Sequence, residues 1–394
     1  MKILVLNSGS SSIKFKLYND DKAVALGLVE KIGENTSKVE LKNLGTDEKF
    51  IKEQAIKNHE EGLDLVNELF KQSGLLEDLS TLDGCGHRVV QGGPNLMKHC
   101  LVTQDVIDEI DRVSIMAPLH NPAHLAGIKT MVKKAPKVPN VVVFDTAFHS
   151  TMPDYAYMYA LPYEYYEKDK IRRYGFHGTS HSYVSRKGAE FLGIDYDNFN
   201  AITAHLGNGA SISAIENGKC VDTSMGLTPL EGLMMGTRCG DIDPAIVPYI
   251  QKLKNLSPDE VDTVMNKKSG FLGVCGYNDV RDVEARIEKN DAKAKLASKM
   301  YNYRLAKYIG SYFAILPRTD ALIFTAGVGE NAISVRKNTC DLIKHLGFEI
   351  DEDLNNTRSK LTVISKASSK VKILIVPTDE EFEIANTTKE IISK

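Results

Sequence analysis

The sequence contains no tryptophan and no pair of cysteines in a C-x-x-C spacing. Its six cysteines are scattered along the chain, at positions 85, 100, 220, 239, 275 and 340. In a chain of this size, such scatter fits reduced core thiols better than a disulfide framework or a zinc site. The sequence also has no H-E-x-x-H motif. Neither pattern therefore supports a transition-metal centre.

Long hydrophobic runs and an excess of one charge are missing as well. The longest apolar stretches are short, such as ILVL, VVVF and ILIV; none could span a bilayer or form the core of a signal peptide. Lysine and arginine number 49, aspartate and glutamate 52, for a net charge of -3. Without a basic field, binding to nucleic acid or to an anionic membrane is not expected. We expect a cytoplasmic protein whose partners are small molecules.

The chain does have length and regular alternation. Its 394 residues exceed the usual size of one domain, so two domains with a cleft are expected. Helical patterns separate many of the strand-like runs, which indicates an α/β protein. These runs cover residues 2–6, 13–18, 85–90, 140–144, 201–205, 211–215, 320–325 and 371–376. A helical stripe that ends at Pro317 consists of Leu296, Met300, Leu305, Ile309, Tyr312 and Leu316.

Two segments about 200 residues apart share one pattern. They are LVLNSGSSSIKFKLYNDDK near the start and ITAHLGNGASISAIENGK from Ile202. Both indicate strand, small-residue turn and strand, and the alignment pairs Gly9 with Gly209 and Ser11 with Ser211. Two domains of like topology are therefore expected, with a boundary near residues 145–153.

Three glycine-containing segments are candidates for binding phosphate or nucleotide. The turn Ser8–Ser12, followed by Lys14, offers backbone N–H groups, hydroxyls and a positive charge to an anion, although a plain serine-rich hairpin explains it equally well. It is not a Walker A loop, because the chain continues as a strand. HLGNGAS from His205 is a second such turn. LIFTAGVGEN from Leu322 leads to a helix expected near Ala332, where a nucleotide or simply a tight connection fits.

Charged side chains stand next to these segments. Arg88 and Arg238 lie in glycine-rich loops, where arginine suits bidentate binding of carboxylate or phosphate; a surface ion pair is the alternative for each. Asp145 and Glu380 follow strands, and oxygen ligands of this kind suit Mg²⁺.

Nine motifs together resemble the acetate kinase family, in its order and nearly from end to end. They are LNSGSSSIKFKLY, HRVVQGG, MAPLHNP, VFDTAFHSTMP, RRYGFHGTSH, AHLGNGASISAI, DTSMGLTPLEGLMMGTRCGDIDP, FTAGVGENA and VPTDEE. This family belongs to the acetate and sugar kinase, heat-shock chaperone and actin superfamily. The resemblance implies two duplicated α/β domains, actin-like and ribonuclease H-like, with a nucleotide cleft between them. It implies residues 1–147 plus 381–394 for the first domain and 148–380 for the second.

The resemblance also implies a reaction and its site. The expected reaction is reversible, direct in-line transfer of phosphoryl between ATP and acetate, giving ADP and acetyl phosphate and serving acetyl-CoA metabolism, by a homodimer. Asp145, His177 and Arg238 would be catalytic, and Asn7 and Glu380 would hold Mg²⁺, or alternatively Mn²⁺. Residues around acetate would be Arg88, Val90, Leu119, Phe176 and Pro229. Those binding ATP or ADP would be Lys14, His205, Leu206, Gly207, Asn208, Gly209, Asp279, Val280, Arg281, Gly327, Val328, Gly329, Glu330 and Asn331.

The chemistry favours counter-charge over a general base. The carboxylic acid substrate is already ionised at neutral pH, so it needs no general base. Asp145 is therefore interpreted as a residue that orients the site or binds a water molecule of the metal ion. Arg88, Arg238, His177 and Lys14 would offset the charge of two anions brought together. Gln91 departs from the family, in which histidine is commoner, and this affects the hydrogen bonding near the substrate.

Three other functions compete with this interpretation. A propionate or butyrate kinase of the same family differs by little, because one methylene discriminates by only about 1 to 3 kcal/mol; Val90, bulkier than the alanine of propionate kinases, favours acetate. An actin-like or chaperone-like ATPase would share the phosphate turns but has no need of Arg88 and an apolar methyl pocket. A sugar kinase would need polar groups where Val, Leu, Phe and Pro stand.

Overall fold

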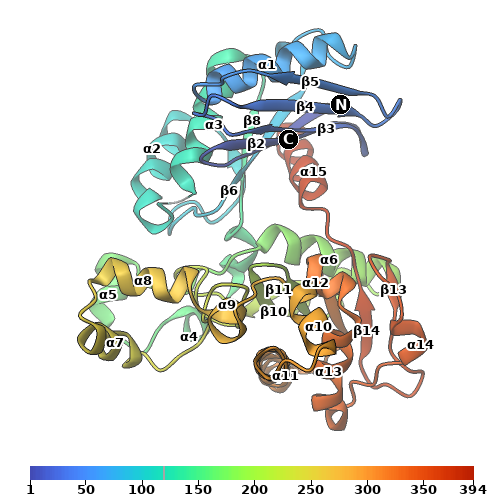
Figure 1. The fold of residues 1–394 in the computed structure, drawn as a ribbon. Coiled ribbons are helices and arrows are strands. Elements are labelled where there is room, and N and C mark those ends of the chain that lie inside the picture. Colours follow the sequence, from blue (N-terminus) through green and yellow to red (C-terminus); the bar gives the residue numbers. More distant parts are fainter. Residues whose placement is uncertain (119) are drawn as a thin grey trace. The chain divides into compact units, whose positions relative to one another are not determined.

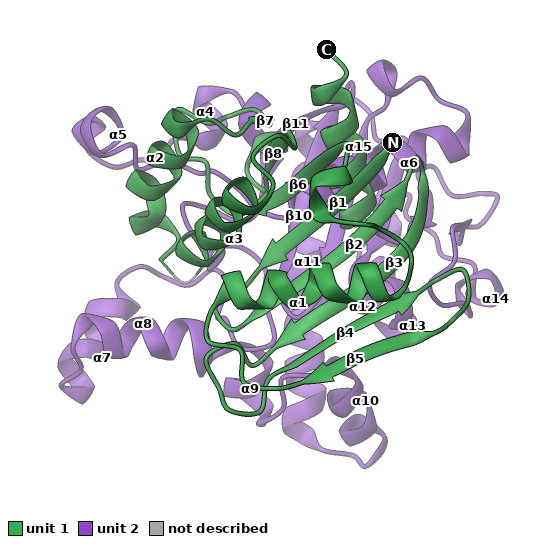
Figure 2. Ribbon diagram, turned by 90° about the horizontal axis from the view of Figure 1, so that it is seen from above, with its two compact units in different colours: residues 1–147, 379–394 green, residues 148–378 purple. Residues whose placement is uncertain are grey.

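The computed structural model describes residues 1–118 and 120–394. The chain forms two compact units, coloured separately in Figure 2. Unit 1 comprises Met1–Ala147 together with Asp379–Lys394, and unit 2 comprises Phe148–Thr378. Within the described ranges, no helix has both the length and the apolar character needed to cross a membrane.

Unit 1 is built on an eight-stranded sheet with the order β5-β4-β3-β2-β1-β6-β8-β7. The strands are β1 (Lys2–Ser8), β2 (Ser12–Asn19), β3 (Lys22–Glu30), β4 (Lys38–Asn43), β5 (Lys49–Glu53), β6 (Gly84–Val89), β7 (Cys100–Leu101) and β8 (Asn140–Phe144). The first five strands pair antiparallel, whereas β6 and β8 continue from β1 in parallel. Parallel strands are covered on both faces, which is why all of β8, NVVVF, is buried.

Helices cover both faces of this sheet (Figure 1). They are α1 (His59–Gln72), α2 (Gln104–Arg112), α3 (Asn121–Lys134) and α15 (Glu380–Ile392), with short 3₁₀ turns η1 (Leu79–Thr81) and η2 (Val113–Met116). Leu4 and Leu6 of β1 face the core formed with α1 and α3, while Ile3 and Val5 face α15. Because strand side chains alternate between faces, this one strand contributes to both cores.

Unit 2 contains a six-stranded sheet with the order β11-β10-β9-β12-β14-β13. Its strands are β9 (Ala201–Leu206), β10 (Ala210–Glu216), β11 (Lys219–Thr223), β12 (Ala321–Thr325), β13 (Thr362–Val363) and β14 (Lys372–Ile375). β9, β10 and β11 pair antiparallel, and β12 and β14 continue from β9 in parallel.

Two long helices pack against this second sheet. α6 (Gly178–Leu192) contacts β9 and β12, and α11 (Ala292–Ile315) contacts β9 and β10. The other helices are α4 (Asp154–Tyr157), α5 (Tyr163–Asp169), α7 (Ile246–Lys254), α8 (Pro258–Lys267), α9 (Gly270–Cys275), α10 (Val280–Glu288), α12 (Ala326–Asn331), α13 (Ile333–Ile343) and α14 (Glu352–Asn355). The 3₁₀ turns are η3 (Ala147–Thr151), η4 (Tyr196–Asn198) and η5 (Lys344–Leu346).

The internal repeat is visible in the strand order. β3-β2-β1-β6-β8 of unit 1 corresponds to β11-β10-β9-β12-β14 of unit 2, with the same parallel and antiparallel pairings. Gly9–Ser11 joins β1 to β2 and Gly207–Gly209 joins β9 to β10. The first turn is one residue longer by strand pairing, because Ser8 pairs with Ile13 and Leu206 with Ala210. The repeat was predicted correctly, but its register was wrong by two residues, since Gly9 corresponds to Gly207 and not to Gly209.

The expected strands are all present, with ends shifted by at most two residues. In the helical stripe, Leu305, Ile309, Tyr312 and Leu316 are buried, but Leu296 is exposed. The helix expected near Ala332 is present as α13, which begins at Ile333 with Ala332 as its N-cap. The glycines before it lie in the short helix α12, which was not predicted.

Candidate functional site

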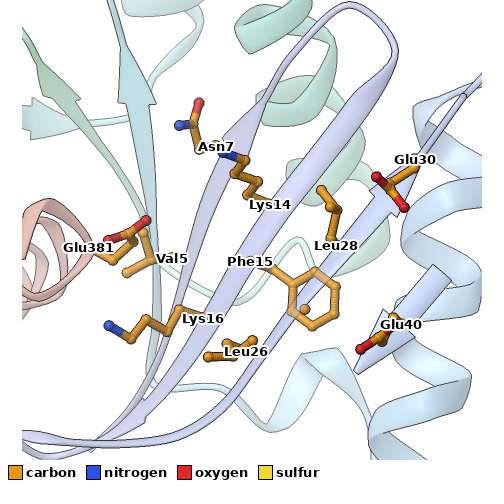
Figure 3. Close-up of a pocket in the computed structure, with 11 residues that line it drawn as sticks. Val5, Asn7, Lys14, Phe15, Lys16, Leu26, Leu28, Glu30, Glu40 and Glu381 are labelled. Carbon is orange, nitrogen blue, oxygen red and sulfur yellow. The ribbon is translucent and has the colours of Figure 1, made fainter. Parts of the chain in front are cut away.

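The serine-rich turn of unit 1 is held from several sides. The Gly9 N–H donates to the carbonyl of Ser12 at 2.7 Å, and a ring nitrogen of His59 lies 2.8 Å from the Gly9 carbonyl oxygen. Ser10 and Ser11 remain exposed at its tip. Lys14 lies opposite Asn7 in the β1–β2 pairing, as Figure 3 shows. An anion at this turn would meet hydroxyl groups and one ammonium group.

Arg88 and Asp145 form a bidentate ion pair at the ends of β6 and β8. The Arg88 Nε donates to Asp145 Oδ1 at 3.1 Å, and its Nη2 donates to the other carboxylate oxygen. The Asp145 side chain is 1% exposed and that of Arg88 22%. Burial alone would lower the pKa of Arg88, but Asp145, Glu380 and Glu381 raise it above its ordinary value. Asp145 therefore fixes the orientation of a permanently charged guanidinium.

Glu380 begins α15 and lies among other acidic groups. The pKa of Glu380 is raised to about 7: burial is the largest cause, Arg88 opposes it, and Asp145, Glu381 and Asp379 add to it. Asp379 caps the helix by accepting the Phe382 N–H at 3.0 Å. It also pairs with Lys16 at 3.2 Å. Glu380 thus holds a negative charge less readily than an exposed carboxyl group, because Arg88 only partly offsets burial and the neighbouring acids.

This acidic cluster fits a hard cation. Mg²⁺ takes oxygen ligands, keeps several waters and uses few protein groups, and Asn7 and Glu380 offer an amide and a carboxylate oxygen. In the described part of the chain, no three His, Cys, Asp or Glu side chains are grouped to hold a metal by themselves.

Gln91 organises the loop that follows Arg88. Its side-chain carbonyl accepts the Gly93 N–H at 2.9 Å. Its own backbone N–H and carbonyl pair with the Asn121 amide at 3.2 and 2.9 Å. Val90 beside it is 5% exposed. The predicted substrate residue Leu119 lies outside the described residues.

In unit 2, His177 and Arg238 flank the turn between β9 and β10. A Cβ placed on Gly209 would lie 3.4 Å from Arg238 Nη1 and 3.6 Å from His177 Nε2. Arg238 donates to the carbonyl of Pro229 at 3.0 Å, and no described carboxylate pairs with it. Burial lowers the pKa of Arg238. A half-buried guanidinium without an acidic partner is poised to bind an anion.

Further histidines stand behind His177. Its ring stacks on that of His205, with centroids 4.2 Å apart. His177 Nδ1 lies 2.9 Å from Ser211 Oγ, and His181 Nε2 lies 2.7 Å from the same oxygen. His205 Nδ1 lies 2.8 Å from Ser180 Oγ.

A cavity of about 820 Å³ opens beside the same turn. Its lining contains eight of the predicted nucleotide residues: Gly207, Asn208, Asp279, Val280, Arg281, Gly327, Val328 and Asn331. Asp279 caps α10 and pairs with Arg281. The remaining unit 2 residues predicted to bind nucleotide border this lining along the chain without belonging to it: His205, Leu206, Gly209, Gly329 and Glu330.

A buried arginine supports the α12 side of the cavity. Arg336 is fully buried and donates to the carbonyls of Gly329 at 2.9 Å, Asn355 at 3.0 Å and Thr357 at 2.9 Å. Burial lowers the pKa of Arg336 to about 10. Its guanidinium connects α12 to the segment that carries Arg358, which also lines the cavity.

Sequence reasoning missed several residues around this site. The cavity also contains Gly236, Phe271, Asn278, Glu284, Tyr301, Ala332 and Arg358. These residues come from separate loops and helices, so no local pattern marks them as a group. Gly236 and Asn278 lie in polar, glycine-containing loops, which is the one weak indication that the sequence offers.

Known proteins resemble this chain over its whole length. The model of the Acetokinase family matches residues 2–386. An acetate kinase of Campylobacter lari is 68% identical over 392 residues, which cover 100% of this chain and 99% of that protein. The crystal structure of Porphyromonas gingivalis acetate kinase has a TM-score of 0.94 at 44% identity, and that of a propionate kinase from Francisella tularensis 0.92 at 43% identity. Each comparison covers 99% of both chains.

These likenesses confirm the expected fold class, a duplicated α/β fold with an actin-like pair of domains. They also confirm the expected class of enzyme, because ATP:acetate phosphotransfer is the activity of this family, with ATP or ADP as substrate. The chain belongs to the acetokinase family.

Proposed function

We propose that this chain transfers phosphoryl reversibly and in line between ATP and acetate, with Mg²⁺, through the residues described above. The observation that carries the assignment is the place of Arg238 and His177, on either side of Gly209 and next to the cavity lined by Gly207 and Asn208. A nucleotide in this cavity would direct its phosphates along the turn toward a guanidinium with no acidic partner.

The carboxylate nucleophile needs positioning and not deprotonation. Acetate is ionised at neutral pH, and Arg88 presents a guanidinium that Asp145 holds in one orientation. The nucleophile attacks the γ-phosphorus and the bond to the β,γ-bridging oxygen breaks, so ADP leaves with that oxygen. Arg238 and His177 donate hydrogen bonds to the transferring group, where charge is spread over its oxygens. Lys14 offsets the charge of the phosphates.

Mg²⁺ would be held by Glu380 and Asn7. When bound, the ion would neutralise charge on the phosphates and on the leaving group. Glu380 is suited to this role because its carboxylate stands among Asp145, Glu381 and Asp379. Glu380→Gln should raise the Mg²⁺ concentration needed for half-maximal rate; an unchanged Mg²⁺ dependence would overturn this ligand.

The apolar residues beside the charged groups bear on which carboxylic acid the enzyme prefers. Val90 and Phe176 are 5% and 3% exposed, and along the chain they lie within two residues of Arg88 and His177 respectively. Two rigid apolar side chains favour acetate over larger acids, although one methylene is worth only about 1 to 3 kcal/mol. The propionate kinase among the similar structures makes propionate the necessary comparison.

The deciding experiment measures ADP formation with ATP and Mg²⁺ in the presence of acetate, propionate, butyrate, glycerol or no acceptor. Hydroxylamine traps any acyl phosphate as its hydroxamate. Acetate-dependent turnover with acetyl hydroxamate, and a kcat/KM highest for acetate, is the expected result. ATP hydrolysis that ignores every acceptor would overturn the assignment, and a higher kcat/KM for propionate would overturn the acyl preference.

A homodimer and a cytoplasmic location complete the proposal. Unit 2 exposes several large apolar side chains around α5: Tyr155, Leu161, Tyr163 and Tyr165. Exposed large apolar side chains, aromatic ones above all, are enriched at protein interfaces. Sedimentation at micromolar concentration should give twice the chain mass, and Tyr163→Glu should shift it toward the monomer; a monomeric wild type would contradict the dimer.

A further inference from the structure

We infer that Thr203, His181 and Ser211 form a directed hydrogen-bond chain that holds the proton of the His177 imidazole on Nε2. These three are positioning residues that act through His177. The inference rests on the proposed role of His177 in phosphoryl transfer, and it goes further by assigning the form in which that imidazole acts.

The chain runs from the core of unit 2 to the turn. Thr203 Oγ1 lies 2.7 Å from His181 Nδ1, and His181 Nε2 lies 2.7 Å from Ser211 Oγ. Ser211 Oγ then lies 2.9 Å from His177 Nδ1. Thr203, His181 and Ser211 are each 0% exposed. Bulk water therefore does not compete for these hydrogen bonds.

The direction of donation is set at the buried end. Within the described part of the chain, the hydroxyl of Thr203 has no hydrogen-bond partner other than His181 Nδ1. Leaving a buried hydroxyl proton without an acceptor is unfavourable, so Thr203 donates and Nδ1 accepts. Burial keeps the pKa of His181 well below its ordinary value. The ring is therefore neutral, and its single proton lies on Nε2.

The position of this proton determines the positions of the other protons along the chain of hydrogen bonds. His181 Nε2–H donates to Ser211 Oγ, which leaves the serine hydroxyl proton to donate to His177 Nδ1. With Nδ1 accepting, the neutral His177 ring carries its proton on Nε2. The opposite tautomer would place two N–H groups against Ser211 Oγ and leave the serine proton without a partner.

A flip of the His177 ring about its Cβ–Cγ bond would put a carbon in place of Nδ1 at Ser211 Oγ and lose that hydrogen bond. His177 stands just before α6 in a left-handed backbone conformation with φ of 56°, and its face is stacked on His205. Its Nε2 edge lies on the Gly209 side, where Arg238 Nη1 also stands. The fixed tautomer thus directs an N–H donor, and not a lone pair, to the place proposed for the anionic phosphoryl group.

The first test requires no substitution. In protein labelled with ¹⁵N histidine, long-range ¹H–¹⁵N spectra distinguish the two tautomers, and a spectrum of His177→Gln assigns the His177 signals. At pH 8 we expect His177 as the Nε2–H tautomer. An Nδ1–H tautomer, or an equal mixture of both, would overturn the inference whatever the activity.

The second test removes the far end of the chain. Thr203→Val keeps the shape but not the hydroxyl and does not touch His177; we expect a mixed His177 tautomer and a kcat lowered on the order of tenfold, the worth of about one hydrogen bond. KM for acetate and ATP should stay within about twofold, and Thr203→Ser should restore both readouts. Ser213→Ala is the matched control, because Ser213 is another buried β10 serine whose hydroxyl bonds Thr223 instead, at 2.8 Å.

A Thr203→Val protein with wild-type tautomer and kcat would refute the chain. Failure of the proposed function would look different: His177→Ala would keep full turnover while the wild-type spectrum still showed the Nε2–H tautomer.

Discussion

Asp145 holds Arg88 through both of its carboxylate oxygens, and the aspartate is almost completely buried. The pair joins the ends of two parallel strands, β6 and β8. A guanidinium held in this way has few orientations open to it before substrate arrives. Preorganised charge of this kind lowers a barrier without reorganisation during the reaction.

Replacing Asp145 tests whether it orients Arg88 or acts as a base. For Asp145→Asn we expect a fold-retaining protein with kcat lowered by about 10², an increased KM for acetate and a changed Mg²⁺ dependence, because Arg88 loses its anionic partner beside Glu380. Steady-state kinetics over a Mg²⁺ series measure all three. A loss of kcat alone that disappears at low pH, where the wild-type carboxylate would be protonated, would instead indicate general base catalysis.

Replacing Arg238 tests charge stabilisation in the transition state. Arg238→Ala should lower kcat by about 10³ while KM for ATP changes only a few-fold. The guanidinium has no acidic partner, so its charge is available to stabilise the transferring group in the transition state. Arg281→Ala is the matched control: Arg281 is exposed, paired with Asp279 and lines the nucleotide cavity, so it should change KM for ATP and spare kcat. Equal effects of the two substitutions would contradict these assignments.

Gln91 should act on the loop after Arg88. Gln91→Ala leaves the buried Gly93 N–H without an acceptor, so the free energy of unfolding should fall by about 1 to 3 kcal/mol and KM for acetate should rise more than KM for ATP. Gln91→His, which can place a ring nitrogen near Gly93, should be milder. Urea denaturation and kinetics provide the measurements, with the exposed Gln104→Ala as control. Identical behaviour of Gln91→Ala and Gln104→Ala would show that the loop does not depend on this amide.

Buried histidines should make the protein sensitive to acid. Burial lowers the pKa values of His87 and His149 to about 4, below the value of about 6.5 in an unfolded chain. The unfolded state therefore binds protons first as the pH falls. The free energy of unfolding is therefore highest above pH 6.5 and falls toward pH 4, by about 1.4 kcal/mol per pH unit for each histidine.

Denaturant unfolding at pH 7, 6 and 5 measures this slope. His149→Gln should reduce this slope by the contribution of about one proton. Substitution of the exposed His345 by Gln should leave the slope unchanged. A slope that His149→Gln does not alter would assign the acid sensitivity to other groups.

Much of this fold could be predicted because its signals lie within short stretches of the sequence. Strands such as VVVF and ILIV are apolar over their whole length, and the repeated strand-turn-strand pattern indicates the duplication. The register of that repeat was misjudged because Ser211 resembles Ser11 in letters, whereas hydrogen bonding places Gly207 where Gly9 stands. Leu296 fits the spacing of the α11 stripe, but tertiary packing leaves it outside.

The site combines residues that lie far apart in the sequence, so less of it could be predicted from local patterns. Gly207 and Gly327 could be proposed singly, but their meeting with Phe271, Tyr301 and Arg358 around one cavity depends on how α9 and α11 pack. Similarly, the resemblance could name His177, but the buried hydroxyls of Thr203 and Ser211 look like ordinary strand residues.

Unit 1 is assembled from both ends of the described chain. Helix α15 covers one face of its sheet, and Ile384 and Thr388 fill the space that Gly86 leaves open on β6. A ribosome must therefore release residues 379–394 before this unit can be completed, whereas unit 2 is one continuous stretch. During synthesis the later-made unit is thus the first that can finish folding, and the first 147 residues must wait with an apolar sheet face uncovered, where a chaperone has reason to bind.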